Sequence, residues 1–228
     1  MEKLVSIIVP AYNEESRIAQ ALEELKQASF AEHGFEKEII IVNDGSRDNT
    51  LGILKKVKGI KLVSYAENRG KGFALRQGFK EAKGSVIAIQ DADLEYDPTN
   101  ISLLLKEILS GHNVVFGSRF KGKPKKMTFT FYFGNKFLSV LTSLLFGQEI
   151  TDMETCQKVF TKGALDKISL SANGFDIEPE LTAKFMKAGH QILELPISYD
   201  AREKEEKKIG VSDGIKAAFV LLRIKIFG

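Results

Sequence analysis

The stretch Val86-Ile87-Ala88-Ile89-Gln90-Asp91-Ala92-Asp93-Leu94-Glu95 joins a short apolar run to a cluster of acids. The apolar run is typical of a strand that is covered on both faces of a sheet. Because alternate side chains of extended backbone point the same way, we expect Asp91, Asp93 and Glu95 to face one spot. Their charges would repel each other without a cation, and oxygen ligands suit Mg²⁺ or Mn²⁺. The alternative is a solvated acidic turn after a strand.

The order of strand, polar loop and helix occurs several times along the first half of the chain. Strands are predicted at 3–10, 38–42, 61–65 and 113–117, and helices at 16–28, 51–57, 73–82 and 99–110. Repeated units of this kind predict a parallel, doubly wound α/β sheet. The polar loops then share the carboxyl edge of the sheet, where open α/β sheets bind ligands.

Two of these loops carry side chains that suit a nucleoside. Tyr12 follows the first strand and could stack on a base, and Glu14 could accept a hydrogen bond from a base or ribose. Asp44 follows the second strand and could accept from a base imino group. Taken singly, each of these residues also fits a turn or a helix N-terminus with no ligand.

The loop after the third strand suits a phosphate group. Gly70 and Gly72 permit close backbone approach at the start of a helix, and Arg69 and Lys71 bring positive charge there. Backbone N–H groups at a helix N-terminus favour anions. The Gly-x-Gly spacing matches neither the P-loop nor the dinucleotide fingerprint. With the acids after the fourth strand, the shared edge predicts a nucleotide site with a divalent cation.

Composition narrows the class of protein. The chain has 228 residues, 43% of them hydrophobic, and a net charge of +3, which is ordinary for a globular protein. The charge and the absence of arginine-rich runs argue against a nucleic acid partner. The single cysteine, Cys156, fits a reducing compartment. The N-terminus lacks the apolar region of a signal peptide.

Five motifs in order resemble the family 2 glycosyltransferases of GT-A fold, and their spacing is similar to that of the dolichyl- or polyprenyl-phosphate sugar synthases. They are Pro10-Ala11-Tyr12-Asn13-Glu14, Val42-Asn43-Asp44-Gly45-Ser46-Arg47-Asp48, Asn68-Arg69-Gly70-Lys71-Gly72, Asp91-Ala92-Asp93-Leu94-Glu95 and Gly117-Ser118-Arg119. The similarity continues through 134–135, 151–160 and 178–181. It implies one GT-A domain over 1–228, with a mostly parallel, Rossmann-like sheet. The half at 1–120 would bind the nucleotide sugar, and the half at 121–228 the acceptor.

The resemblance also implies roles at the donor end. Base and ribose would be held by Pro10, Tyr12, Glu14 and Asp44. Asp91 would lie beside the ribose and diphosphate, with Asp93 and Glu95 as ligands of Mg²⁺ or Mn²⁺. The related synthases often carry Gln at the position of Glu95, so this chain has an additional negative charge there.

At the acceptor end, the resemblance implies that Arg119 and Arg202 clamp a phosphate with forked donors. Because an acceptor phosphate is already mostly ionised at neutral pH, it needs no general base. Asp152 would then orient groups at the acceptor site. In relatives that use a hydroxyl acceptor, a carboxylate near this position serves as the general base. The alternative is a structural role, in which Asp152 caps a helix or a turn.

Two apolar segments of the second half suggest contact with a membrane. The segment 127–147 is long enough to span a bilayer, but Gly134-Asn135-Lys136 and several hydroxyls interrupt it. We expect an interfacial helix after the basic loop 121–126, with a pair of core helices as the alternative. The tail 211–227 is amphipathic and could lie on an anionic membrane surface or pack on the domain. The resemblance implies that the charged loop 199–208 is a mobile lid that brings Arg202 to the site, and a simply solvated loop is the alternative.

The resulting hypothesis is an inverting, metal-dependent glycosyltransferase that moves mannose or glucose from GDP-mannose or UDP-glucose to dolichyl or polyprenyl phosphate. It would be cytoplasmic and peripheral to the inner face of the cell membrane. Two alternatives stay open: a soluble family 2 enzyme that acts on a saccharide hydroxyl, and a non-catalytic module that binds nucleotide sugars.

Overall fold

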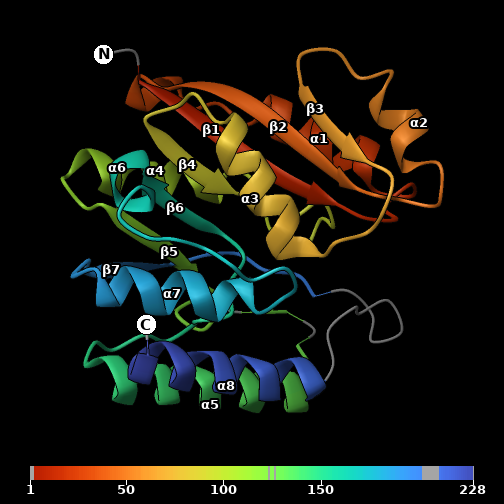
Figure 1. The fold of residues 1–228 in the computed structure, drawn as a ribbon. Helices are drawn as coiled ribbons and strands as arrows, with labels where there is room; N and C mark the ends of the chain where they lie inside the picture. Colours follow the sequence, from red (N-terminus) through yellow and green to blue (C-terminus); the bar gives the residue numbers. More distant parts are fainter. Residues whose placement is uncertain (1–2, 123, 126, 202–210, 228) are drawn as a thin grey trace.

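A seven-stranded sheet in the order β3-β2-β1-β4-β6-β5-β7 forms the centre of the molecule (Figure 1). The computed structural model describes residues 3–122, 124–125, 127–201 and 211–227. Its strands are β1 (Leu4–Ala11), β2 (Glu36–Asp44), β3 (Lys61–Tyr65), β4 (Val86–Ile89), β5 (Val114–Ser118), β6 (Lys158–Thr161) and β7 (Ile192–Pro196). Neighbouring strands are parallel, except that β6 is antiparallel to both β4 and β5. The predicted α/β fold with a mostly parallel sheet is confirmed.

Helices cover both faces of this sheet and close two apolar cores. One core lies under α1 (Ile18–Gln27), α2 (Thr50–Leu54) and α4 (Asn100–Leu109). The other lies under α3 (Lys71–Glu81) and α7 (Ile177–Lys187). The short elements η1 (Ala31–His33) and α6 (Lys162–Leu165) complete the connections. Strands such as Val86–Ile89 are buried throughout because they touch both cores, which explains their continuous apolar sequence.

Two long helices of the second half lie side by side beyond α7 (Figure 1). These are α5 (Phe129–Phe146) and α8 (Val211–Phe227). Each buries one side in the core and leaves large apolar side chains in solvent on the other. The exposed set, called the apolar face below, consists of Phe129, Phe133, Phe137, Val140 and Leu144 on α5 and Ile215, Phe219, Leu222 and Ile226 on α8. Among the described residues, none of the helices has the length and apolar character needed to cross a bilayer.

Candidate active site

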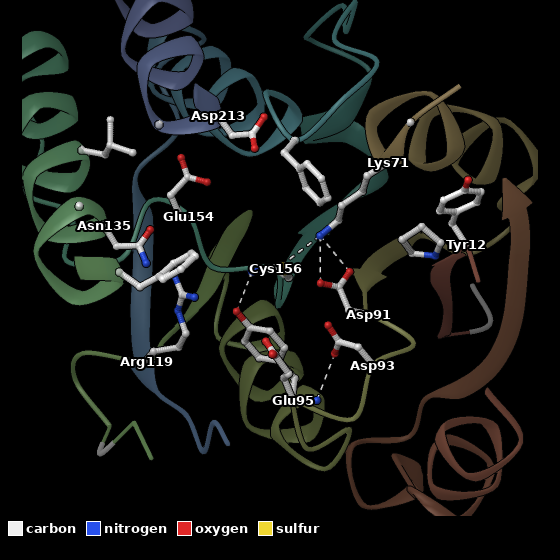
Figure 2. Close-up of a pocket in the computed structure, with 18 of the residues that line it drawn as sticks. Tyr12, Lys71, Asp91, Asp93, Glu95, Arg119, Asn135, Glu154, Cys156 and Asp213 are labelled. Atoms are coloured by element: carbon white, nitrogen blue, oxygen red, sulfur yellow. Dashed lines mark hydrogen bonds and ion pairs between the residues drawn. The ribbon is translucent and has the colours of Figure 1, made fainter. Parts of the chain in front are cut away.

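A cavity of about 1120 Å³ lies at the carboxyl edge of β1, β2 and β4 and continues to α5 and α8 (Figure 2). The shared edge predicted from the sequence is therefore real, and the second half of the chain closes its far side. Most of the predicted site residues line this cavity, namely Pro10, Tyr12, Glu14, Asp44, Lys71, Asp91, Asp93, Glu95 and Arg119. Arg69 and Asp152 are not part of its lining, and Arg202 lies outside the described residues.

The acids after β4 do not continue the strand, so the expected extended geometry is wrong. The strand ends at Ile89, and the backbone turns at Leu94, which has a φ of 65°. Asp91 and Asp93 both reach the cavity, and the Asp93 carboxylate accepts a hydrogen bond from the Glu95 amide at 3.1 Å. Glu95 is largely buried and accepts from the Tyr199 hydroxyl at 2.7 Å. Within the described residues, no three His, Cys, Asp or Glu side chains are placed to hold a metal ion together.

Buried amide side chains hold this turn in place. Gln90 donates to the carbonyl of Tyr96 at 2.9 Å and closes the turn at its base. Gln157, in the segment before β6, donates to the Gln90 side-chain oxygen at 2.8 Å and to the carbonyl of Asp97 at 2.9 Å. Because the antiparallel strand β6 lies next to β4, residues far apart in the sequence form this network. Neither glutamine was among the predicted site residues.

Lys71 lies in the cavity beside the turn that carries Asp91, Asp93 and Glu95, called the acid turn below. Its Nζ lies 2.9 Å from Asp91 Oδ1 and 3.0 Å from Cys156 Sγ (Figure 2). The same Nζ lies 3.1 Å from Glu178 Oε1. Burial alone would lower the pKa of Lys71, but the charges of Asp91 and Glu178 outweigh it and hold the pKa well above its usual range. Lys71 therefore stays charged and can attract a phosphate group.

The backbone amides at the start of α3 are occupied by the protein, contrary to the phosphate cradle that we expected. Gly72 N donates to the carbonyl of Gly174, and Phe73 N donates to the carbonyl of Asn173. A Cβ on Gly72 would lie 2.6 Å from the carbonyl oxygen of Ala172, so the close approach that this glycine permits is to another segment of the chain. The amides of Gly72 and Phe73 are therefore not open to a phosphate group, and Lys71 offers its side chain to one instead.

Asp44 holds the loop before α3. Its carboxylate accepts hydrogen bonds from the amides of Arg69 and Gly70 and from the Asn68 side chain, each at 2.8 Å. The Arg69 side chain stacks on the ring of Phe73, with its Cζ 4.9 Å from the ring centroid. Of the two cations that the sequence offered for phosphate, the structure thus places Lys71 in the cavity and Arg69 against an aromatic ring.

Arg119 stands at the end of β5 and forms the cationic wall on the other side of the cavity. Its Nε and Nη2 donate to the two oxygens of Asp152 at 2.8 and 2.7 Å, and its backbone amide donates to the same carboxylate. Asp152 is fully buried, and its own amide donates to Glu194 on β7 at 2.8 Å. Burial opposes the charge on Arg119, but Asp152 compensates and raises the pKa of the guanidinium further. Asp152 thus fixes the direction of Arg119.

Glu154 also lines the cavity, although it was not among the predicted site residues. Burial raises its pKa to about 7, and the charge of Glu178 adds to this effect, while Lys158 and Arg119 oppose it. Lys158 is fully buried in β6, where its Nζ contacts Glu178. In the sequence, the sign of this cluster was a run of polar residues that leads into an otherwise apolar strand. Charged residues are seldom buried in such a strand unless they are paired.

Comparison with known proteins identifies the family of this chain. Residues 6–169 match the family model described as glycosyl transferase family 2. The chain is 32% identical to dolichyl-phosphate beta-glucosyltransferase ALG5A of Trichomonas vaginalis, over 98% of this chain and 73% of that protein. It is 31% identical to UDP-N-acetylglucosamine–dolichyl-phosphate N-acetylglucosaminyltransferase of Methanococcus voltae, over 99% of this chain and 97% of that protein.

Solved structures agree on the fold. Glucosyl-3-phosphoglycerate synthase of Mycobacterium tuberculosis, crystallised with Mn²⁺, UDP and phosphoglyceric acid, superposes with a TM-score of 0.74. The superposition covers 99% of this chain and 80% of that one, at 18% identity. The architecture is the GT-A fold that the motifs implied. The chain belongs to glycosyl transferase family 2 and is a glycosyltransferase.

Proposed function

We propose that this enzyme transfers mannose or glucose from a GDP- or UDP-sugar to dolichyl or polyprenyl phosphate with inversion, in the presence of a divalent cation. Two relatives that align over almost the whole chain are named for transfer to dolichyl phosphate. A structural neighbour was crystallised with UDP and Mn²⁺. These similarities support the proposed classes of donor and acceptor, and the residues that line the cavity support the proposed sugar transfer.

The observation that carries the proposal is the continuity of the cavity with the apolar face. Phe137 on α5 and Ile215 on α8 line the cavity and are also 64% and 69% exposed. Arg119, which suits a phosphate group, stands in the same cavity. A ligand that joins a phosphate to a long hydrocarbon chain would meet both features at once, while a soluble saccharide would use only the first.

The donor would lie at the opposite end, where the loops after β1, β2 and β4 meet. Tyr12, Glu14 and Asp44 line the cavity there and would hold the base and ribose. Lys71 would offset charge on the diphosphate as it leaves. Because the amides of α3 are engaged with residues 173–174, this side chain carries the interaction that we had expected of the helix N-terminus.

A divalent cation fits the acid turn if the substrate supplies part of its coordination. Mg²⁺ is commonly held by one or two carboxylates together with substrate phosphates. Asp93 and Asp91 line the cavity and could provide those carboxylates, although Asp91 is also paired with Lys71 and Glu95 accepts a hydrogen bond from Tyr199. The bound cation would withdraw charge from the departing diphosphate.

The transfer itself needs no basic side chain. The acceptor phosphate is already mostly ionised near neutral pH, so one of its oxygens can attack the anomeric carbon as the bond to the nucleoside diphosphate breaks. Arg119 would orient this phosphate, and Asp152 would keep the guanidinium in position. Arg202, the second expected clamp, lies outside the described residues.

The apolar face would rest on the inner surface of the cell membrane. Amphipathic helices lie in the interface with the apolar side buried among the lipids and basic groups near the anionic headgroups. Arg223 and Lys225 are exposed near the end of α8 and suit such headgroups. The lipid acceptor could then reach Arg119 without leaving the bilayer.

One observation favours a second candidate, the transfer to a saccharide hydroxyl. Glu154 stands in the cavity with its pKa raised to about 7, which suits a general base at neutral pH.

One assay tests the proposal. Each labelled UDP- or GDP-hexose is incubated with the protein, Mg²⁺ or Mn²⁺, and either polyprenyl phosphate in vesicles or a panel of saccharides. We expect label to enter the organic phase only when polyprenyl phosphate is present. Label that appears only in saccharide products would support the second candidate, and binding of the donor without transfer to any acceptor would support a non-catalytic module.

A further inference from the structure

Glu154 has a carboxylate oxygen that the protein itself leaves without a hydrogen bond. Its Oε1 is shielded from solvent and has no hydrogen-bond partner among the described residues. An unpaired buried polar atom costs free energy, and more so when the group is charged. Because the side chain also lines the cavity, the missing donor is expected to arrive with a substrate.

The chemistry of the proposed substrates narrows the donor. The diphosphate of the donor and an ionised acceptor phosphate present oxygen acceptors and negative charge, which a carboxylate would repel. A polyprenyl chain has no hydrogen-bond donors at all. The transferred sugar, by contrast, carries several hydroxyl groups, each of which can donate to a carboxylate oxygen.

The position of Glu154 favours the transferred sugar over the ribose. Figure 2 places Tyr12 far from Glu154, which lies toward Asn135 and Arg119. Arg119 is close enough for its charge to lower the pKa of Glu154, so this carboxyl group belongs to the acceptor side of the cavity. In a direct displacement, the sugar must lie between the diphosphate and the acceptor phosphate. A carboxylate near Arg119 can therefore reach the sugar and not the nucleoside.

We infer, on the basis of the function proposed above, that Glu154 accepts a hydrogen bond from a hydroxyl group of the transferred hexose and so helps to select the donor sugar. The raised pKa of Glu154 agrees with this role, since burial without a donor disfavours the carboxylate. A sugar hydroxyl would supply the hydrogen bond that Glu154 Oε1 does not receive from the described residues. The neighbouring Asn135 also lines the cavity and offers an amide to the same ligand.

Calorimetry with the full chain and Mn²⁺ tests this inference. The probes are UDP-glucose and GDP-mannose, each compared with UDP or GDP alone. We expect Glu154→Gln to lower the affinity for the nucleotide sugar by about tenfold, which corresponds to about 1.4 kcal/mol. The affinity for the free diphosphate should change by less than about twofold. Glu149→Gln is the matched control, because Glu149 precedes the same segment but is exposed and outside the cavity.

Analogues of the donor that lack one hydroxyl group identify the contact. For one analogue, the wild-type protein should lose about tenfold in affinity while Glu154→Gln loses nothing further, which is the coupling expected of a direct hydrogen bond. Equal losses for the sugar nucleotide and the free diphosphate, or no loss for either, would overturn the inference. An intact affinity with a large fall in kcat would instead make Glu154 a general base.

The outcomes also separate this inference from the proposed function. If Glu154→Gln weakens the donor selectively but no label enters polyprenyl phosphate, the inference stands and the proposed acceptor is wrong. If lipid is labelled and the variant binds the donor as tightly as the wild type, the function stands and the inference is wrong. A wild-type protein that binds neither nucleotide sugar would refute both. Thermal unfolding of Glu154→Gln shows whether a loss has a structural cause.

Discussion

The Nη2 of Arg119 lies 2.7 Å from Oδ1 of Asp152, in a forked ion pair whose carboxylate is fully buried. Asp152→Asn would leave the guanidinium without its anion, and breaking such a pair by removing one partner costs about 3 kcal/mol. We expect a lower free energy of unfolding and a raised KM for the lipid acceptor, with the donor KM almost unchanged. Partial activity should remain, because the donor end of the cavity keeps its contacts.

Urea unfolding and initial rates at varied acceptor concentration measure these effects. Asp166→Asn serves as the control, since Asp166 is exposed and lies outside the cavity. Complete inactivity of Asp152→Asn with normal stability would identify Asp152 as a base and favour a hydroxyl acceptor.

Asp93→Ala should abolish transfer without unfolding the protein. The Asp93 carboxylate accepts a hydrogen bond from the Glu95 amide, so the substitution removes a contact within the turn. Loss of charge stabilisation at the diphosphate is expected to lower the rate by about a thousandfold. Scintillation counting of lipid product measures this, with circular dichroism as the folding check. Full activity in Asp93→Ala would remove the acid turn from the mechanism.

The ionisation of Glu154 should make stability depend on pH. Its folded pKa of about 7 is higher than the ordinary value of 4.5, because of burial and of Glu178. Well below pH 4.5 the carboxyl group is protonated in both the folded and the unfolded state, so it does not change the free energy of unfolding. As pH rises toward 7, the unfolded state releases a proton that the native state retains, so stability falls by about 1.4 kcal/mol per pH unit.

Glu154→Gln removes this titration. Its free energy of unfolding should match that of the wild type below pH 4.5 and exceed it above pH 7 by roughly 3 kcal/mol. The charges of Glu178, Lys158, Arg119 and Asp152 all act on Glu154, so the midpoint reports the whole cluster. Urea midpoints at a series of pH values would disprove the shift if the two curves stay parallel.

Charged residues introduced into the apolar face should weaken the binding of the protein to membranes. Leu144 and Phe219 are 79% and 66% exposed, one on each helix of that face. Replacing both with Glu should weaken binding to anionic vesicles by about a hundredfold, since each loses the burial of a large apolar side chain. Leu103→Glu is the control, because Leu103 is 52% exposed but belongs to α4, on the other side of the sheet. Equal sedimentation of both proteins with vesicles would contradict membrane docking by α5 and α8.

Gly72→Ala should destabilise the fold, because its Cβ would lie 2.6 Å from the Ala172 carbonyl oxygen. Overpacking of this kind costs about 1–3 kcal/mol. Gly163→Ala is the matched helical control, since a Cβ there meets nothing within 4 Å. Thermal unfolding distinguishes the two variants. A similar stability for both would mean that the segment 172–174 yields easily to the new methyl group.

The sequence predicted the strands and the edge that carries the site because those features depend on local pattern. The continuous apolar run at 86–89 indicated a buried strand, and the polar loops after parallel strands had to meet at one edge. The acid turn after that strand was not predictable in the same way. Its path depends on Gln157, which reaches Gln90 only because β6 inserts next to β4.

Tertiary structure also decided which charges face a ligand. Arg69 and Lys71 are equivalent in the sequence, yet packing places one against Phe73 and the other in the cavity. Glu154 was missed because the polar run before β6 does not show by itself which of its acids faces a cavity. The sequence by itself determined the α/β fold class, the family and the edge of the sheet that binds ligands. Only the folded chain decided which side chains are paired and which remain for a substrate, since burial and pairing depend on contacts between distant segments.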